Sequence, residues 1–266
     1  MTILEVNRTA LAKRVLGEDG YQRAIRKWGI WKQRPRVGHV RFGQLRRTEP
    51  ICREYGFARG LPIDRYYIEK FLDTERALVT GRVLEIGERT YTERFGHDVA
   101  RSDMSHFNEV PGATYAADLT DAPHIPSHTY DCIIITQTLQ FIFDMKAAVA
   151  TLHRILAPGG VVLCTVPGIS QIADPEWQAS WSLNEATAQW LFATAFDADE
   201  LRITTNGNVL SATSFLHGLA TSELTTDELD VVDSEYPVTV TIVARKKPPG
   251  EARKKAAGEP DTDASS

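Results

Sequence analysis

The stretch Val83-Leu84-Glu85-Ile86-Gly87 is a short apolar run that contains one acid and ends in a glycine. Such a run predicts a buried strand that leaves the sheet at the glycine. A glycine at the end of a strand lets the backbone approach a ligand closely, because it has no Cβ atom. The Glu85 carboxylate can accept hydrogen bonds from ammonium or hydroxyl groups of that ligand. Many strands end in glycine, so the stretch gains its meaning from its neighbours.

Helix and strand patterns alternate on both sides of this run. Apolar residues at helical spacing predict helices over residues 66–78, 145–156 and 209–219, and one that begins at Ser182 with a capping box closed by Glu185. Short apolar runs predict strands over residues 82–86, 98–102, 114–117, 130–136, 161–166, 201–205 and 238–244. Several of these runs are apolar on both faces, which predicts an α/β fold with a mostly parallel sheet covered by helices on both sides. Ligands bind such sheets beyond the carboxyl ends of the strands, so residues directly after strands are the candidates.

The composition is ordinary for a globular chain of 266 residues, with 42% hydrophobic and 24% charged residues. The three cysteines, Cys52, Cys132 and Cys164, are far apart and form no C-x-x-C pair, which argues against a zinc site or a disulfide framework. We expect no bound metal. The N-terminus has no signal-peptide pattern and no apolar run is long enough to span a membrane, so we expect a cytoplasmic protein.

The charge is distributed unevenly along the chain. Residues 1–50 contain 12 Lys and Arg against 4 Asp and Glu, which leaves 18 against 31 for the rest. We expect a basic N-terminal helical region over residues 1–50 with a helix over residues 8–28, a main domain over residues 51–245 and a disordered tail over residues 246–266. An acidic body binds nucleic acid poorly, so we expect no nucleic-acid partner. The basic region can face an anionic partner, cover the acidic body or form a homodimer contact.

Further elements follow the first strand in a recognisable order. Asp103 comes after the second expected strand, Asp118 after the third, and residues 152–167 read LHRILAPGGVVLCTVP. Together with Val83–Gly87, these elements over residues 55–245 resemble class I S-adenosylmethionine (SAM)-dependent methyltransferases. The resemblance implies a Rossmann-like seven-stranded sheet with SAM as the cofactor. It also implies that Glu85 and Gly87 bind SAM, that Asp103 holds the ribose hydroxyls and that Asp118 contacts the adenine amino group, although each acid can instead be a helix cap.

The chain departs from the family pattern at two places. Arg89 and Tyr91 stand where the family has further glycines, and Leu139-Gln140-Phe141 stands where a Glu-His pair is common. A bulky loop narrows the room for the methionine part of SAM, and it indicates either a changed loop path or a lost cofactor site. Residues 55–67, 87–91 and 207–210 resemble a bacterial subgroup that often accompanies glycosyltransferases, and in that subgroup the loop without glycines is normal.

Other polar residues are candidates for cofactor binding or catalysis. Gln137 and Thr138 follow a buried strand and are expected to line the site. Arg59 or Tyr66 can bind the SAM carboxylate, because a guanidinium can donate two hydrogen bonds to one carboxylate; the alternative is a solvated helix start. His106 and His217 are candidate general bases for an oxygen nucleophile, although a single histidine is more often a packing or surface residue.

Aromatic residues follow the fifth strand. We expect Trp190 to belong to the core, while Trp177 and Trp181 can pack against a sugar ring or a planar substrate, or against one another in a lid. The predicted function is methyl transfer from SAM to a hydroxyl of a small-molecule acceptor, a sugar or a glycosylated metabolite by resemblance alone. The alternatives are another small molecule or a lipid as acceptor, a non-catalytic binding protein of the same fold, and a nicotinamide-dependent oxidoreductase. The missing G-x-G-x-x-G disfavours the oxidoreductase.

Overall fold

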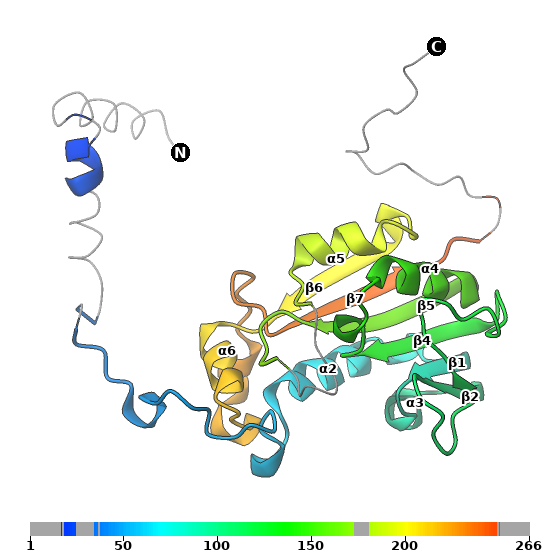
Figure 1. Ribbon diagram of the computed structural model, residues 1–266, viewed down its shortest axis with the longest axis horizontal. Helices are drawn as coiled ribbons and strands as arrows, with labels where there is room; N and C mark the ends of the chain where they lie inside the picture. The colour runs from blue at the N-terminus through cyan, green and yellow to red at the C-terminus, as the bar shows by residue number, and fades with distance from the viewer. Residues whose placement is uncertain are drawn as a thin grey trace. The chain divides into compact units, whose positions relative to one another are not determined.

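The computed structural model describes residues 17, 19–24, 35–36, 38–172, 181–248 and 250, and the chain divides into two compact units, residues 1–48 and 49–266 (Figure 1). In the first unit residues 19–24 are helical, and a 3₁₀ turn spans Gly43–Leu45. Most of the helix expected over residues 8–28 lies outside the described residues, as does most of the expected tail. The second unit contains every described strand.

A seven-stranded sheet forms the centre of the second unit. Its strands are β1 (Gly81–Ile86), β2 (Val99–His106), β3 (Tyr115–Ala116), β4 (Tyr130–Thr136), β5 (Leu156–Pro167), β6 (Leu201–Asn206) and β7 (Thr239–Arg245). They lie in the order β3-β2-β1-β4-β5-β7-β6, and β7 alone runs antiparallel to its neighbours, β5 and β6. The predicted α/β fold with a seven-stranded, mostly parallel, Rossmann-like sheet is therefore confirmed.

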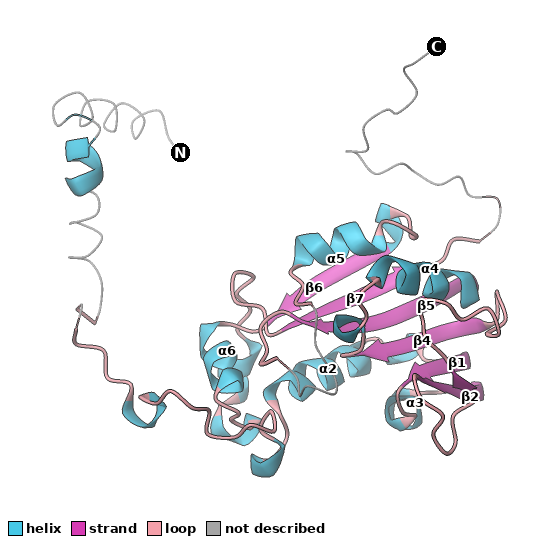
Figure 2. Ribbon diagram, in the orientation of Figure 1, coloured by secondary structure: helices cyan, strands magenta, loops and turns pink. Residues whose placement is uncertain are grey.

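Helices cover both faces of this sheet. They are α2 (Ile63–Thr74), α3 (Thr90–Phe95), α4 (Met145–Ile155), α5 (Glu185–Phe192), α6 (Val209–Leu216) and α7 (Thr226–Asp230). Figure 2 shows α4 and α5 on one side of the sheet and α2 and α3 on the other. Side chains alternate along each strand, so Ile133 packs with α4 and α5, whereas Cys132 and Ile134 pack with α2 and α3. A third cluster joins the start of α2 to α6 and α7.

Several predicted boundaries differ from the structure, and two of these errors have a clear local cause. The helix after β5 begins at Glu185 rather than Ser182, because the Asn184 side chain accepts a hydrogen bond from the backbone N–H of Thr187 and forms the capping box. Strand β2 continues to His106 rather than ending at Ser102, because Ser105 and His106 pair with β3. Because β2 is longer than predicted, Asp103, which was expected to follow the strand, lies within it.

The strand order places a ligand crevice at a definite edge. The chain goes from β1 outward to β2 and β3 and then returns to β4 on the other side of β1. A crevice forms beyond the carboxyl ends of the strands at such a reversal. The residues that follow β1, β2, β4 and β5 therefore border the candidate site.

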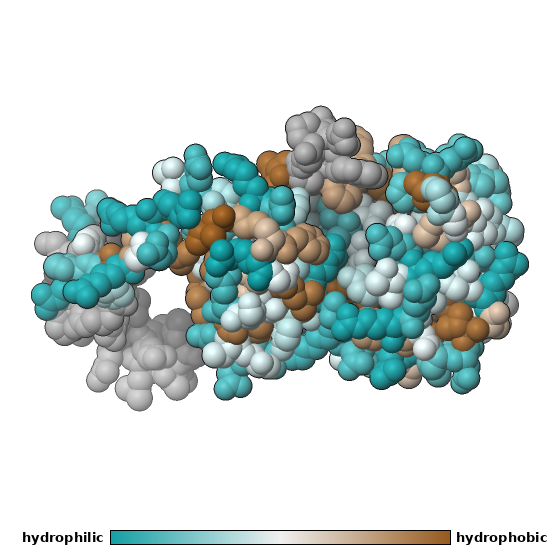
Figure 3. Space-filling view, turned by 90° about the horizontal axis from the view of Figure 1, so that it is seen from below, coloured by the Kyte–Doolittle hydropathy of each residue, from teal (hydrophilic) through white to brown (hydrophobic). Residues whose placement is uncertain are grey.

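The surface of the described part mixes polar and apolar side chains. On the face seen in Figure 3 the apolar residues form separate groups between polar ones. Among the described residues, no helix has the length and apolar character that a membrane span needs.

Candidate functional site

Gly87 makes the turn that leaves β1. Its φ is +101°, a left-handed conformation that L-residues with a side chain rarely adopt, and its N–H donates to the carbonyl of Ser105 at 2.8 Å. A Cβ atom added at Gly87 would meet no heavy atom within 4 Å, so the space above this turn is open. This turn is therefore half-buried backbone with open space above it, and its contact with a ligand stays a prediction.

Glu85 holds the segment that comes after the turn. Its buried carboxylate accepts hydrogen bonds from the backbone N–H of Tyr91 at 3.0 Å and from the N–H and Oγ1 of Thr92, each at 2.7 Å. Burial raises the pKa of Glu85, and the hydrogen bonds from Thr92 oppose that rise. The expectation that this carboxylate faces the ligand's ammonium is not what the contacts show, because the acid caps α3 instead.

Arg89 and Tyr91 do not close over the glycine turn. Tyr91 lies in α3, where its ring stacks on Phe95 with centroids 6.2 Å apart and packs in the core beneath the sheet. Arg89 extends to the β2–β3 loop and donates to the carbonyl of Gly112 at 2.8 Å. Of the two expectations for this bulky loop, a changed path accounts for its shape, since Gly87 leads within three residues into a short helix.

Asp103 lies inside β2 rather than after it, and its placement after the strand is the principal error of the sequence prediction. Its side chain is 3% exposed. Its carboxylate accepts hydrogen bonds from Arg82 and Arg101, at 2.9 Å each for the closest contacts, and from Tyr130 Oη at 3.1 Å. Burial alone would raise the pKa of Asp103, but the hydrogen bonds from Arg101, Arg82 and Tyr130 outweigh burial and lower it. Asp103 is therefore held within the sheet by three side chains, and its role toward the ribose stays a prediction.

His106 occupies the carboxyl end of β2 instead. Its Nδ1 lies 3.0 Å from both the backbone N and the carbonyl oxygen of Asn108. It borders a shallow depression with Gly87 and Arg89. Sequence reasoning singled out His106 as a base, whereas the structure places it beside the glycine turn.

Asp118 follows β3 as predicted. It is exposed, and its Oδ1 accepts hydrogen bonds from the N–H and the Oγ1 of Thr120, each at 2.8 Å. The carboxylate therefore also caps the turn after β3, which was the alternative interpretation of this residue.

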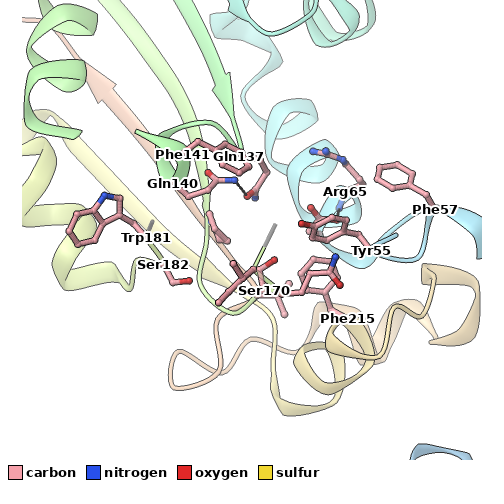
Figure 4. Close-up of a pocket in the computed structure, with 15 residues that line it drawn as sticks. Tyr55, Phe57, Arg65, Gln137, Gln140, Phe141, Ser170, Trp181, Ser182 and Phe215 are labelled. Atoms are coloured by element: carbon pink, nitrogen blue, oxygen red, sulfur yellow. Dashed lines mark hydrogen bonds between the residues drawn. The ribbon is translucent and has the colours of Figure 1, made fainter. Parts of the chain in front are cut away.

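A second, more enclosed cavity of about 410 Å³ lies beyond the carboxyl ends of β4 and β5 (Figure 4). Its lining residues are aromatic, amide, hydroxyl or aliphatic except for one acid and one arginine: Tyr55, Phe57, Asp64, Arg65, Gln137, Gln140, Phe141, Pro167, Ser170, Gln171, Ile172, Trp181, Ser182, Phe215 and Val238. A volume of this size suits part of a cofactor together with a small molecule.

Gln137 is the most unusual residue of this cavity. Its φ is +47°, which is uncommon for a residue with a side chain. Its Nε2 and the Oε1 of Gln140 are buried, and neither has a hydrogen-bond partner among the described residues, although Gln140 Nε2 donates to Gln137 Oε1 at 3.3 Å. Backbone strain and orphaned polar atoms together mark a site that a ligand completes.

The residues before β1 that line the cavity are not the ones expected to bind the SAM carboxylate. Arg59 makes two contacts with the Glu223 carboxylate, and Tyr66 Oη donates to Asp230 at 2.6 Å, so both side chains are bound away from the cavity. Arg65 and Asp64, at the start of α2, line the cavity instead. Figure 4 shows Arg65 across the cavity from Gln137.

The remaining predicted residues fall into two groups. Thr138 lies beside Gln137, and its Oγ1 donates to the carbonyl of Thr136 at 3.0 Å. His217 ends α6, where its carbonyl accepts hydrogen bonds from Ile51 and Cys52, and it borders none of the cavities found among the described residues.

The three tryptophans after β5 differ in where they lie. Trp181 lines the cavity and donates from Nε1 to the carbonyl of Phe143 at 3.3 Å. Trp190 is 71% exposed on α5, so its expected place in the core is wrong; Leu191 and Phe192 fill the core there. Trp177 lies outside the described residues.

Comparison with known proteins agrees with this arrangement. Residues 65–221, more than half of the chain, match the family described as methyltransferase domain. The chain therefore belongs to the methyltransferase domain family and is a SAM-dependent methyltransferase, with SAM as the methyl donor. A search of curated proteins found none that matches.

Solved structures of low sequence identity are similar to part of this chain. A SAM-dependent methyltransferase from Archaeoglobus fulgidus is 14% identical, with a TM-score of 0.46 over 68% of this chain and 94% of that chain. One from Mesorhizobium loti is 16% identical, with a TM-score of 0.46 over 69% and 100%. The N-methyltransferase NodS from Bradyrhizobium japonicum, in complex with S-adenosyl-L-homocysteine (SAH), is 12% identical, with a TM-score of 0.45 over 74% and 94%.

Proposed function

We propose that the protein transfers the methyl group of SAM to a hydroxyl of an uncharged small molecule, a sugar or a glycosylated metabolite. The observation that carries the proposal is the cavity at the carboxyl ends of β4 and β5, which lies at the crevice of the sheet and combines aromatic rings with amide and hydroxyl groups. Rings such as Trp181 offer a flat apolar face for a sugar ring, and polar side chains such as those of Ser170 and Gln171 can exchange hydrogen bonds with its hydroxyls.

The charge of the lining residues favours a neutral acceptor. Arg65 is the one lysine or arginine among the described lining residues, and Asp64 stands directly beside it. A phosphorylated or nucleotide-linked acceptor would need more cations than this to replace its hydration.

The residues present fit SAM at several points. Gly87 leaves open space for the ligand to approach the backbone, and Gln137 offers a buried N–H without a partner among the described residues. We place the adenosine half over Gly87 and the end of β2, where His106 takes the position expected of Asp103, with Asp118 toward the adenine. Bound SAM supplies a methyl group on a positively charged sulfur.

The chain's own contribution is to bring the acceptor oxygen into line with that methyl group. Orientation of two reactants in one cavity removes most of the entropic cost of their encounter. Neither His106 nor His217 lines the enclosed cavity, so the acceptor hydroxyl passes its proton to water rather than to a histidine as the methyl group is transferred and SAH is left. The aromatic walls of the cavity hold the acceptor while exposing one hydroxyl.

The test is transfer of labelled methyl from SAM to three sets of acceptors: neutral glycosides with free hydroxyls, the same glycosides as phosphate esters, and long-chain alcohols. Label in the neutral glycosides, reduced at least about 10-fold by Trp181→Ala, would support the proposal. Trp190→Ala is the matched control, because Trp190 is exposed on α5 outside the cavity. Label mainly in phosphate esters or in alcohols would contradict the proposed acceptor class, and SAM binding without transfer to any set would favour a non-catalytic binding protein.

A further inference from the structure

Two charged residues occupy the first turn of α2, close in sequence to the Arg59 and Tyr66 that were expected to bind the SAM carboxylate. Asp64 is buried, and its Oδ1 accepts a hydrogen bond from the backbone N–H of Arg65 at 2.9 Å. The Arg65 guanidinium carbon lies 5.9 Å from the centroid of the Phe57 ring, which restricts its position by a cation–π contact. Both residues line the enclosed cavity.

This pair also faces the helix that comes after the glycine turn. Burial raises the pKa of Tyr91 in α3, the positive charge of Arg65 lowers it, and the negative charges of Glu69 and Asp64 raise it. Tyr91 is thus within electrostatic reach of both members of the pair. Tyr91 belongs to α3, which begins three residues after Gly87.

Across the cavity, Gln137 and Gln140 present one buried donor and one buried acceptor. Gln137 Nε2 and Gln140 Oε1 have no hydrogen-bond partner among the described residues. A buried amide group left without a partner costs about 1–3 kcal/mol, so a ligand that supplies the missing partners gains affinity. The two walls together offer two donors, Arg65 and Gln137, and two acceptors, Asp64 and Gln140.

We infer that this quartet binds the zwitterionic amino-acid end of the methyl donor, with Arg65 and Gln137 donating to its carboxylate and Asp64 and Gln140 accepting from its ammonium group. The inference rests on the proposed function, and it adds the residues that recognise one end of SAM. The fork of a guanidinium matches a carboxylate, and a carboxylate with an amide oxygen matches an ammonium group. Burial raises the pKa of Asp64, and an ammonium group beside it would offset that cost.

Three ligands separate the parts of this site in calorimetric titrations of the full chain. SAH carries both charged groups, decarboxylated SAM carries the amino group alone, and 5′-methylthioadenosine carries neither. Arg65→Met should weaken SAH binding about 10- to 100-fold and leave binding of the other two ligands unchanged. Asp64→Asn should weaken binding of SAH and of decarboxylated SAM while sparing methylthioadenosine.

Arg59→Met is the matched control, because Arg59 is paired with Glu223 outside the cavity, and its SAH affinity should equal that of the wild type within about twofold. If Arg65→Met fails to fold, Gln137→Glu gives the same comparison of SAH with methylthioadenosine, because it replaces the unpartnered Nε2 by a second acceptor and keeps the Oε1 that accepts from Gln140 Nε2.

The possible outcomes separate the inference from the proposed function. Equal losses of SAH and methylthioadenosine affinity in the Arg65 variant, or no loss of either, would overturn the inference while leaving the SAM site intact. A folded wild-type protein that binds none of the three ligands would overturn the proposed function as well.

Discussion

Asp103 shows how a single side chain can match a functional motif and serve the fold instead. Both of its oxygens are taken by Arg82, Arg101 and Tyr130 inside the sheet, with Thr114 Oγ1 3.2 Å away. A carboxylate that neutralises two arginines and is 3% exposed is expensive to remove. We therefore propose that its main contribution is to the stability of the sheet around β2.

We predict that Asp103→Asn lowers the free energy of unfolding by about 2–4 kcal/mol at pH 7, measured by urea titration, and changes SAH affinity less than about threefold among folded molecules. Asp121→Asn is the control, because Asp121 is an exposed acid of the same region. A variant as stable as the wild type but unable to bind SAH would show that Asp103 is a ligand-binding residue after all.

The same acid gives a pH dependence with a definite sign. The pKa of Asp103 is lowered in the folded protein, so as the pH falls the unfolded chain takes up this proton first, near about pH 4. The stabilisation is therefore present above about pH 4 and is lost as the pH falls through the lower, folded-state value. The stability gap between wild type and Asp103→Asn should narrow below about pH 4; a constant gap down to about pH 2 would contradict this account.

At the scale of elements, the alternation of apolar runs was enough to predict all seven strands and four of the helices. What could not be predicted from the chain was where β2 ends, because its last two residues are held by pairing with the two-residue strand β3. The choice between Arg59 and Arg65 was equally out of reach, since Glu223, distant in sequence, binds Arg59. Local patterns predict elements, whereas partners far along the chain decide which side chain faces the site.

Lys246, which follows β7, makes a contact with the end of α4 that the composition of the tail did not indicate. The expected disordered tail began at this residue, yet Lys246 is buried, and its Nζ donates to the carbonyls of His153 at 2.7 Å and Leu156 at 2.8 Å. A cation that binds the last carbonyls of α4 satisfies groups that have no partner within the helix and complements its dipole. The ordered chain therefore extends past β7 to close the end of α4.

We predict that Lys246→Met lowers the free energy of unfolding by about 2 kcal/mol, because the buried carbonyls lose their donor. The control is Lys146→Met, because Lys146 is an exposed lysine of α4, the helix whose end Lys246 contacts. This substitution should change stability by less than about 0.5 kcal/mol. Thermal and urea unfolding both report the difference. Equal effects of the two variants would show that the contact at Lys246 adds nothing.

At the scale of the whole molecule, residues 49–266 contain every described strand and the core clusters on both faces of the sheet. We predict that a chain lacking residues 1–48 folds, with an unfolding midpoint within about 2 °C of the full chain, and binds SAH with the same affinity. Differential scanning calorimetry and SAH titration test this. Aggregation of the shortened chain, or loss of SAH binding, would show that the basic region is part of the catalytic unit.

We propose that the turn at Gly87 and the crevice beside it bind SAM despite Arg89 and Tyr91. The most direct measurement is calorimetric titration of the folded full chain with SAH, with Gly87→Val alongside, because a β-branched residue is strained at a φ of +101° and fills the open space above the turn. The account predicts a dissociation constant in the micromolar range for the wild type and loss of binding for the variant. No heat of binding to a wild-type protein shown to be folded would contradict it.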